Sequence, residues 1–196
     1  VTSPYGTTGG QGWYDSGATA YSTLNTGVVD NGNGTRHVFT SWSGDASGTD
    51  YNQTNPIVMI APKTAVANWK TQYTVAFDHS GLDSSASGTA VTVNGSLIAY
   101  EQLPYVNWTD SGSSITYFYG NVSSSTPEKQ FILINVAGLP SPITVTSPMN
   151  VTGNYKIQYE VTFNQTGVGF DFTATVVTVD SNGYTVSSLP VSFWWD

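Results

Sequence analysis

The chain repeats itself with a period of 86 residues. Shifted by 86, the stretch Pro56–Asp110 lies without a gap on Pro142–Asp196. Of the 55 aligned positions 18 are identical, among them the pairs Tyr73/Tyr159, Val75/Val161, Phe77/Phe163, Gly81/Gly167, Thr89/Thr175, Leu103/Leu189, Pro104/Pro190, Trp108/Trp194 and Asp110/Asp196. A fixed period of this kind is typical of an array of modules rather than of one enzyme-like body. The first question about function is therefore what such an array holds together.

The period divides the 196 residues into about two and a quarter modules. We expect a first module at 1–72 whose first strand is truncated, a second at 73–156, and an incomplete third at 157–196 that holds only opening strands. Because Val1 is neither an initiator Met nor the start of a signal peptide, we expect the chain to be a processed or excised piece of a longer precursor.

Alternation of apolar and polar residues with period two predicts half-buried strands. It occurs at Tyr73–Phe77, Thr89–Val93, Lys129–Asn135, Tyr159–Phe163 and Thr173–Val179. Turn sequences lie between such runs, at Asp30–Gly34, Asn94–Gly95 and Asp180–Gly183. No window has the apolar spacing of an amphipathic helix. We predict an all-β fold of tandem small antiparallel modules, each an Ig-like β-sandwich or an open barrel.

The same phase in matched strands predicts the core. We expect eight side chains to be buried, four in each repeat copy: Val75, Phe77, Val91 and Val93, and then Val161, Phe163, Val177 and Val179.

A Trp-x-Asp motif recurs in every predicted module. Trp13–Gly17 matches Trp108–Gly112, and Trp194–Asp196 is a third copy. Since each tryptophan comes before a predicted strand, the first interpretation is that it plugs one end of a module core. The alternative is an exposed platform on which sugar rings stack, which needs the indole face in solvent.

The residues 1–72 resemble a known family. Gly12–Ala20, then Phe39–Asp45 with its Trp-Ser-Gly-Asp signature, then Pro62–Trp69 are similar to the divergent internalin-type repeat of large archaeal and bacterial surface proteins. The later modules keep the closing strand, with Val151–Tyr155 against Val66–Trp69, but lack the signature. The resemblance implies a β-rich spacer on the cell exterior and implies no catalytic residues.

Composition excludes several classes of partner. Charged residues make up 9% of the chain, against roughly 25% in ordinary soluble domains, while Ser and Thr number 23 and 27. A surface of hydroxyls and amides is typical of extracellular proteins. The net charge is −8 and the five basic residues are scattered, so we expect no nucleic-acid partner. The longest apolar runs are too short to span a bilayer, and the absence of cysteine excludes disulfides and thiolate metal sites.

N-linked glycosylation is the strongest functional signal. Seven acceptor sequons Asn-x-Ser/Thr are present, at Asn33, Asn52, Asn94, Asn107, Asn121, Asn150 and Asn164. With 14 Asn residues in a Ser/Thr-rich chain, about three or four would arise by chance. The alternative interpretation is that such a composition makes sequons freely. We predict that several carry glycan.

Candidates for other chemistry are weak. The loop Asp45–Asn52 places oxygen ligands near a glycine, as calcium requires, but it lacks the alternating ligands and closing Glu of an EF-hand, so a solvated loop is favoured. Neither His37 nor His79 lies in a triad pattern, and no pair of carboxylates indicates a glycosidase. We expect no catalytic residue, no cofactor and no enzyme activity.

The sequence therefore predicts a structural repeat protein of an extracellular, glycosylated filament, sheath or surface layer. The alternative is a cell-surface adhesin or carbohydrate-binding spacer module. Residues Ile157–Asp196 contain opening strands without the later ones. We expect them to pair with β-structure of a neighbouring molecule, head to tail with strand donation, or with the continuation of the same longer chain.

Overall fold

The computed structural model describes all 196 residues, and it confirms the all-β class. Several small antiparallel sheets make up the fold, which is consistent with an all-β sandwich or Ig-like arrangement. The only helical segments are two 3₁₀ turns of three residues each, so no helix is long or apolar enough to cross a membrane. In chain order the elements are β1 Thr8–Gly9, β2 Thr19–Ala20, β3 Thr23–Leu24, β4 Val28–Asp30, β5 Thr35–Gly44, β6 Ile57–Val58, β7 Ala65–Ser80, β8 Ala86–Ser87, β9 Thr89–Val93, β10 Ser96–Ala99, η1 Tyr100–Gln102, β11 Tyr105–Asp110, β12 Ser114–Ile115, β13 Tyr117–Tyr119, β14 Val122–Ser124, β15 Lys129–Ala137, β16 Ile143–Thr144, β17 Met149–Phe163, β18 Val177–Val179, β19 Asn182–Tyr184, η2 Val186–Ser188 and β20 Val191–Trp195.

Two compact units interleave along the chain. Unit 1 consists of Val1–Ala76, Val106–Thr116 and Gly138–Val151, and unit 2 consists of Phe77–Tyr105, Tyr117–Ala137 and Thr152–Asp196. The long strands β7 and β17 each contribute residues to both units. The module boundaries expected after residues 72 and 156 stay a prediction.

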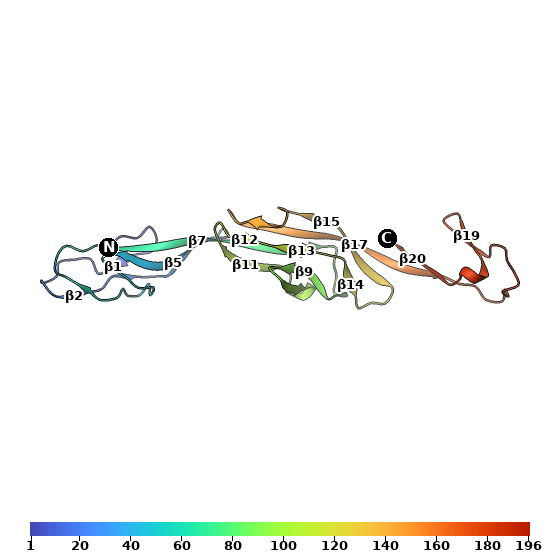
Figure 1. The fold of residues 1–196 in the computed structure, drawn as a ribbon, viewed down its shortest axis with the longest axis horizontal. Helices are drawn as coiled ribbons and strands as arrows, with labels where there is room; N and C mark the ends of the chain where they lie inside the picture. Colours follow the sequence, from blue (N-terminus) through green and yellow to red (C-terminus); the bar gives the residue numbers. More distant parts are fainter. The chain divides into compact units, whose positions relative to one another are not determined.

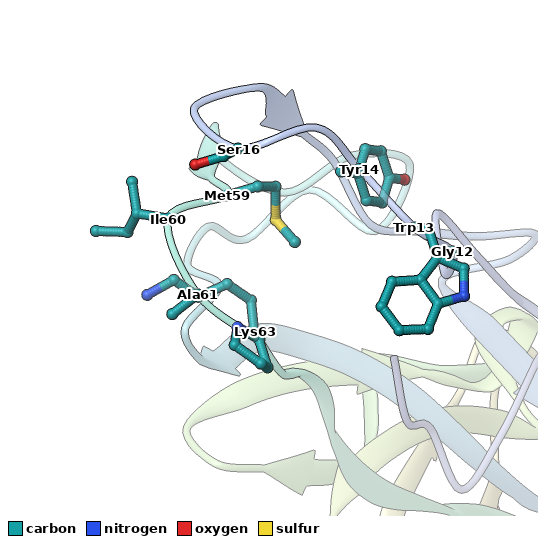
Figure 2. Close-up of a pocket in the computed structure, with 9 residues that line it drawn as sticks. Gly12, Trp13, Tyr14, Ser16, Met59, Ile60, Ala61 and Lys63 are labelled. Carbon is teal, nitrogen blue, oxygen red and sulfur yellow. The ribbon is translucent and has the colours of Figure 1, made fainter.

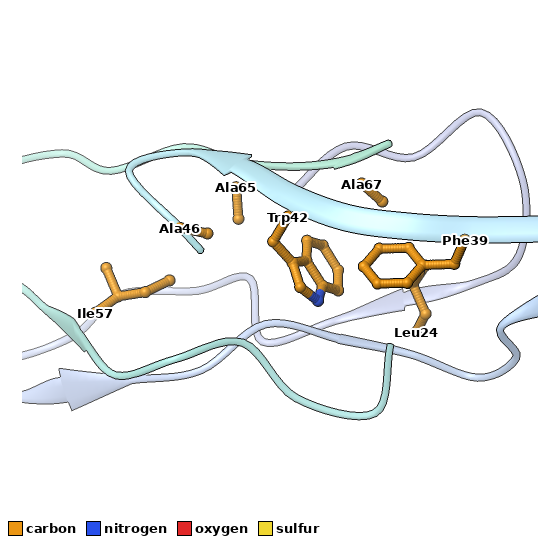
Figure 3. Packing of buried hydrophobic residues seen from close by; sticks show 7 residues of the cluster. All are labelled: Leu24, Phe39, Trp42, Ala46, Ile57, Ala65 and Ala67. Carbon is orange, nitrogen blue, oxygen red and sulfur yellow. The ribbon is translucent and has the colours of Figure 1, made fainter. Parts of the chain in front are cut away.

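Unit 1 is built around the antiparallel pair of β5 and the first part of β7, which lie side by side (Figure 1). β4 continues this sheet beyond β5, and β1–β3, β2–β6 and β12–β16 form two-stranded pairs. Figure 3 shows one core of this unit, in which the ring of Phe39 packs against the indole of Trp42 at 5.4 Å between centroids. The buried residues of this cluster are Leu24, Phe39, Trp42, Ala46, Ile57, Ala65 and Ala67.

Unit 2 has the hairpin β9–β10, whose strand β9 also pairs with β13 on its other edge. β14 lies between β8 and β15, and β15 pairs with β17. β20 lies along the end of β17 (Figure 1), and β18 pairs with β19. The expected strand at Thr173–Val179 is shorter than predicted, because only Val177–Val179 has a pairing partner.

The structure reproduces the sequence repeat in its backbone pairing. In β5–β7 the register slips by one residue directly after the pair Phe39–Trp69. In β15–β17 it slips directly after the pair Leu133–Tyr155, and Tyr155 is the repeat equivalent of Trp69. A bulge bends its strand at a defined place, so the two strand pairs are bent at equivalent positions.

The Trp-x-Asp-Ser-Gly motif has the same backbone contacts in both of its complete copies. Gly17 N donates to Met59 O at 2.9 Å, and Gly112 N donates to Val145 O at 2.8 Å. Met59 and Val145 are 86 residues apart. The short pairs β2–β6 and β12–β16 follow these contacts in the same register. The motif therefore begins each module by pinning a turn to the strand that precedes β7 or β17.

The segments after the long strands also match. β9, β10, η1 and β11 are followed 86 residues later by β18, β19, η2 and β20. Both hairpins turn through a positive φ of 48°, at Asn94 and at Asp180. Asn and Asp tolerate this conformation better than other residues with a Cβ, which explains why the turn sequences were recognisable.

The predicted core is confirmed in the first repeat copy and only partly in the second. The four expected side chains of the first copy are at most 4% exposed, namely Val75, Phe77, Val91 and Val93. In the second copy Val179 is 6% exposed and buried, whereas Phe163 and Val177 are half-buried. The prediction is wrong for Val161, which is 39% exposed.

The difference has a physical cause in unit 2. Tyr117 of β13 packs on the Phe77 ring at 5.5 Å between centroids, and Tyr119 Oη donates to Asp78 O at 2.9 Å. Phe163 instead contacts only rings of its own hairpin, Phe193 and Trp195. Matched strands thus differ in burial because β13–β15 cover one copy and no such strands cover the other.

We expect Phe77→Ala and Phe163→Ala to differ strongly in cost. Phe77 is fully buried, so its truncation removes apolar contacts, leaves a cavity and lowers the free energy of unfolding by about 3–5 kcal/mol. Phe163 is half-buried, so its truncation costs clearly less. Chemical denaturation of the two variants measures the difference, and equal losses would contradict the burial described here.

Candidate functional site

Unit 2 exposes several large apolar side chains in its C-terminal part. We call them the C-terminal apolar face: Tyr159, Val161, Val168, Phe170 and Phe172. Their exposed fractions run from 37% for Val168 to 84% for Phe170. Exposed apolar patches mark interaction sites in soluble proteins.

The repeat supplies a direct comparison for this face. Its members Val161, Val168 and Phe172 are the equivalents of Val75, Leu82 and Ala86, which are all buried. In unit 2, β13, β14 and β15 cover the hairpin of the first repeat copy by pairing with β9, β8 and β17. At these three positions the C-terminal apolar face is therefore the uncovered form of a surface that is covered in the first repeat copy.

Each Trp-x-Asp motif at the end of a hairpin is held by a carboxylate clamp. In unit 1 the Asp110 carboxylate accepts hydrogen bonds from Gln72 Nε2 at 2.6 Å and Lys70 Nζ at 3.0 Å. In unit 2 Asp196 accepts from Gln158 and Lys156, both at 2.9 Å, and the four partners obey the 86-residue shift. Bonds to the charged form of a carboxyl favour ionisation.

The clamp lowers both carboxyl pKa values. The pKa of Asp110 lies below its usual value because Gln72 and then Lys70 donate to it. The pKa of Asp196 is lowered first by Lys156 and then by Gln158. Sequence reasoning paired neither carboxylate with its partners, although the conserved spacing of Lys, Gln and Asp in both repeat copies was the available signal.

A second ion pair is specific to the covered hairpin in unit 2. Lys129 Nζ lies 2.6 Å from Asp83 Oδ2, and the Lys129 side chain is only 10% exposed. The hydrogen bond from Lys129, with further ones from Ser85, lowers the pKa of Asp83 to about 2. This pair fastens the start of β15 to the loop before β8.

The tryptophans of the motif do not plug a core, so that interpretation is wrong. Trp13 is fully exposed and Trp194 is 38% exposed. Trp108 is half-buried under the Arg36 guanidinium, whose carbon lies 4.4 Å from the ring centroid. The reason is that aliphatic residues already fill the adjacent interior of unit 1: Ile115, Ile143 and Val145 are at most 4% exposed.

Trp13 borders an open hollow of about 460 Å³ in unit 1. Figure 2 shows its indole standing clear of the chain, with Met59, Ile60 and Lys63 on the other side of the hollow. Ile60 is 73% exposed. One free indole beside an apolar rim gives a surface that can contact a flat apolar partner, including a sugar ring.

The β4 strand is an open edge in unit 1. It pairs with β5 alone, whereas its structural counterpart β14 pairs with both β15 and β8. Val28 of β4 is 45% exposed. Unpaired backbone groups on such an edge are a template for another strand.

All seven sequon asparagines are exposed: Asn33, Asn52, Asn94, Asn107, Asn121, Asn150 and Asn164. Exposure is the condition that a bulky glycan requires. Three of the side chains also accept backbone hydrogen bonds through Oδ1: Asn33 from Thr35 N, Asn121 from Leu133 N and Asn164 from Gln165 N. Glycan on these residues stays a prediction.

The calcium loop is organised by other contacts. Asp45 accepts hydrogen bonds from Lys63 Nζ at 3.1 Å and from Thr64 N at 2.8 Å, which lower its carboxyl pKa. Asp50 Oδ1 accepts from Asn52 N. The structure has no group of three or more His, Cys, Asp or Glu residues placed to hold a metal ion.

The two histidines have structural surroundings. The His37 ring stacks on Tyr5 at 3.7 Å, and its Nδ1 lies 3.2 Å from Thr71 Oγ1. His79 packs beside Tyr100. Thr71 is a hydroxyl partner of His37, but no carboxylate is hydrogen-bonded to either ring to complete a triad.

Comparison with known proteins adds no relative. No family model, no curated protein and no solved structure matches the chain. The internal comparison between the two repeat copies therefore carries the argument about function.

We expect the native protein to be heavier than its polypeptide. Glycan on at least three of the seven exposed sequons adds mass in sugar increments to the 20.9 kDa chain. Intact-mass measurement on native material, before and after release of N-linked glycans, gives the number of occupied sites. A native mass equal to that of the bare polypeptide would remove the glycosylation prediction.

Proposed function

We propose that this chain is a structural repeat protein whose molecules join head to tail in an extracellular, glycosylated filament, sheath or surface layer. The observation that supports it is the C-terminal apolar face, whose equivalent in the first repeat copy is covered by β13–β15. The proposed occupant of this face is unit 1 of a second molecule.

The first part of the chain contains counterparts of the covering strands. β3, β4 and β5 follow the motif at Trp13 in the order in which β13, β14 and β15 follow the motif at Trp108. Leu24 of β3 and Tyr119 of β13 are both 3% exposed, and β5 has the same bulge as β15. A second molecule thus offers strands of the required kind and order.

The open edge of β4 fits the same arrangement. β14 receives β8, and the repeat equivalent of β8 is the segment 172–173, which belongs to no strand. Phe172 is 47% exposed. Pairing of this segment with β4 of a second molecule would satisfy backbone groups on both sides.

Such a contact joins two different surfaces of the same molecule. Contacts of this heterologous kind repeat without limit unless the rotation closes a ring, so they produce open fibres. Main-chain pairing supplies strength, and the apolar side chains supply the hydrophobic contribution, roughly 25 cal/mol per Å² of apolar surface removed from water.

The surface chemistry supports an extracellular location. Seven exposed sequons and a surface rich in Ser and Thr suit a glycan coat, and the net charge of −8 opposes binding to nucleic acid. The proposed partners are further molecules of the same chain and the attached N-linked glycans. The proposed role needs no catalytic residue and no cofactor.

Carbohydrate binding is the second candidate, and the free indole of Trp13 is the observation that favours it. In this function the chain is a cell-surface adhesin or spacer that contacts sugars through Trp13 and Ile60. Trp13→Ala then abolishes retention on polysaccharide columns, with Trp108→Ala as the matched control at a half-buried site. A Trp13→Ala variant that is retained like the wild type would contradict sugar binding at this hollow.

Head-to-tail assembly predicts that Val161→Asp reduces polymer formation without unfolding the monomer. Val161 is 39% exposed, so the substitution disturbs the isolated chain little, but it places a charge on the surface that a second molecule must bury. Electron microscopy and light scattering of unglycosylated 1–196 measure polymer length at several concentrations.

Thr162→Asp is the matched control, because it adds the same charge one residue away on the opposite face of β17. We expect this control to form polymers like the wild type. Polymers of normal length from Val161→Asp would refute the role of the face. A wild-type chain that stays monomeric at every concentration would refute head-to-tail assembly by 1–196.

A further inference from the structure

The first ten residues fill surfaces of unit 1 without belonging to its central sheet. We call residues 1–10 the N-terminal plug. Thr2 forms a parallel bridge with Val66, donating from its N to Ala65 O and accepting from Ala67 N. β1 pairs with β3, and the Tyr5 ring stacks on His37.

The plug occupies positions that strands of the preceding hairpin occupy in unit 2. Thr8 of β1 lies opposite Leu24, as Val91 of β9 lies opposite Tyr119. Leu24 and Tyr119 are the matched buried residues of β3 and β13. β1 therefore stands beside β3 where β9 stands beside β13.

The start of the plug repeats a second contact. Ser3 Oγ accepts a hydrogen bond from Trp69 Nε1 at 3.0 Å in unit 1. In unit 2 the repeat equivalent of Trp69 is Tyr155. Gly81, directly after β7, approaches the backbone of Tyr155 so closely that a Cβ on Gly81 would overlap Tyr155 O. Residues 1–3 thus lie where the end of a preceding long strand lies in the covered copy.

We propose that the β3–β7 surface under the plug is the docking surface for β18 and the end of β17 of a second molecule. The plug must then leave before a head-to-tail joint forms. This inference rests on the proposed head-to-tail assembly, and it adds that the free molecule is self-capped. The plug keeps β3 and the start of β7 paired until an incoming hairpin replaces it.

The contacts favour this exchange. β1 contributes two paired residues to its ladder with β3, while β9 contributes three residues to its ladder with β13. The plug has one side chain, Tyr5, in ring contacts with unit 1, to His37 and Trp69. The incoming hairpin brings the whole C-terminal apolar face, whose burial the plug cannot match.

A reversible disulfide tests the exchange. The ideal Cβ position at Gly9 lies 3.9 Å from Thr23 Cβ, which is within the range that disulfides require. The chain has no cysteine, so Gly9→Cys with Thr23→Cys forms only this intramolecular bond in a monomer. We expect the oxidised variant to stay monomeric and the same sample to form polymers after reduction. Gly9→Cys alone, kept under the same oxidising conditions at low concentration, is the control.

Tyr5→Ala is a second variant, and it is expected to speed polymer formation where the disulfide prevents it. It removes the ring contacts of the plug to His37 and Trp69, so we expect a shorter lag before polymers appear. Polymers from the oxidised variant in wild-type yield would overturn plug exchange while leaving head-to-tail assembly intact. Monomers in every sample, wild type and reduced variant included, would overturn both proposals.

Discussion

A strand of 16 residues is far longer than the five or six residues that are typical of a strand, and one small module cannot cover all of it. β7 gives its first twelve residues to unit 1 and its last four to unit 2. β17, with 15 residues, is also shared, with its first three residues in unit 1 and its last twelve in unit 2. Because each long strand ends in an apolar face that needs further strands, every module in such a design depends on the next.

This dependence explains why unit 2 has two different surfaces with related sequences. The hairpin of the first repeat copy is covered and its Val91 is fully buried. The hairpin of the second copy keeps the same turn, 3₁₀ segment and carboxylate clamp, which are all local features. Only the features that require distant strands differ between the two copies.

The difference between local features and features that need distant strands also explains which predictions from sequence succeeded. Period-two alternation located β9, most of β15 and the later parts of β7 and β17, and the turn residues located the hairpins, because pleating and turn geometry are local. Val75 and Val161 stand in matched local patterns, so no local rule separates their exposures of 0% and 39%. Trp108 was likewise misplaced, because its cover is the Arg36 side chain from a strand about seventy residues earlier.

The candidate site was predictable in outline alone. The sequence indicated that 157–196 lacks covering strands, and the seven sequon asparagines were found by their motif. The plug was not predictable, since residues 1–10 have no sequence equivalence to β9. They share with it only the place beside an equivalent strand, which is β3 for the plug and β13 for β9. Strand exchange between unrelated sequences is invisible to repeat detection because backbone hydrogen bonds carry little sequence information.

The ion pair between Lys129 and Asp83 distinguishes the covered hairpin of unit 2 from the proposed contact between two molecules. The corresponding positions of a joint between two molecules are Thr35 and Gly169, which cannot form an ion pair. Likewise Gln130 stands at the position of Arg36. Both donate to the equivalent glutamine, Gln158 or Gln72, but Arg36 also lies over the ring of Trp108. Tandem modules with a common architecture risk joining in the wrong order, and differences in charge at otherwise equal joints provide discrimination. In the proposed assembly, these differences would let each hairpin bind its own partner surface in preference to the others, so that the modules join in one order.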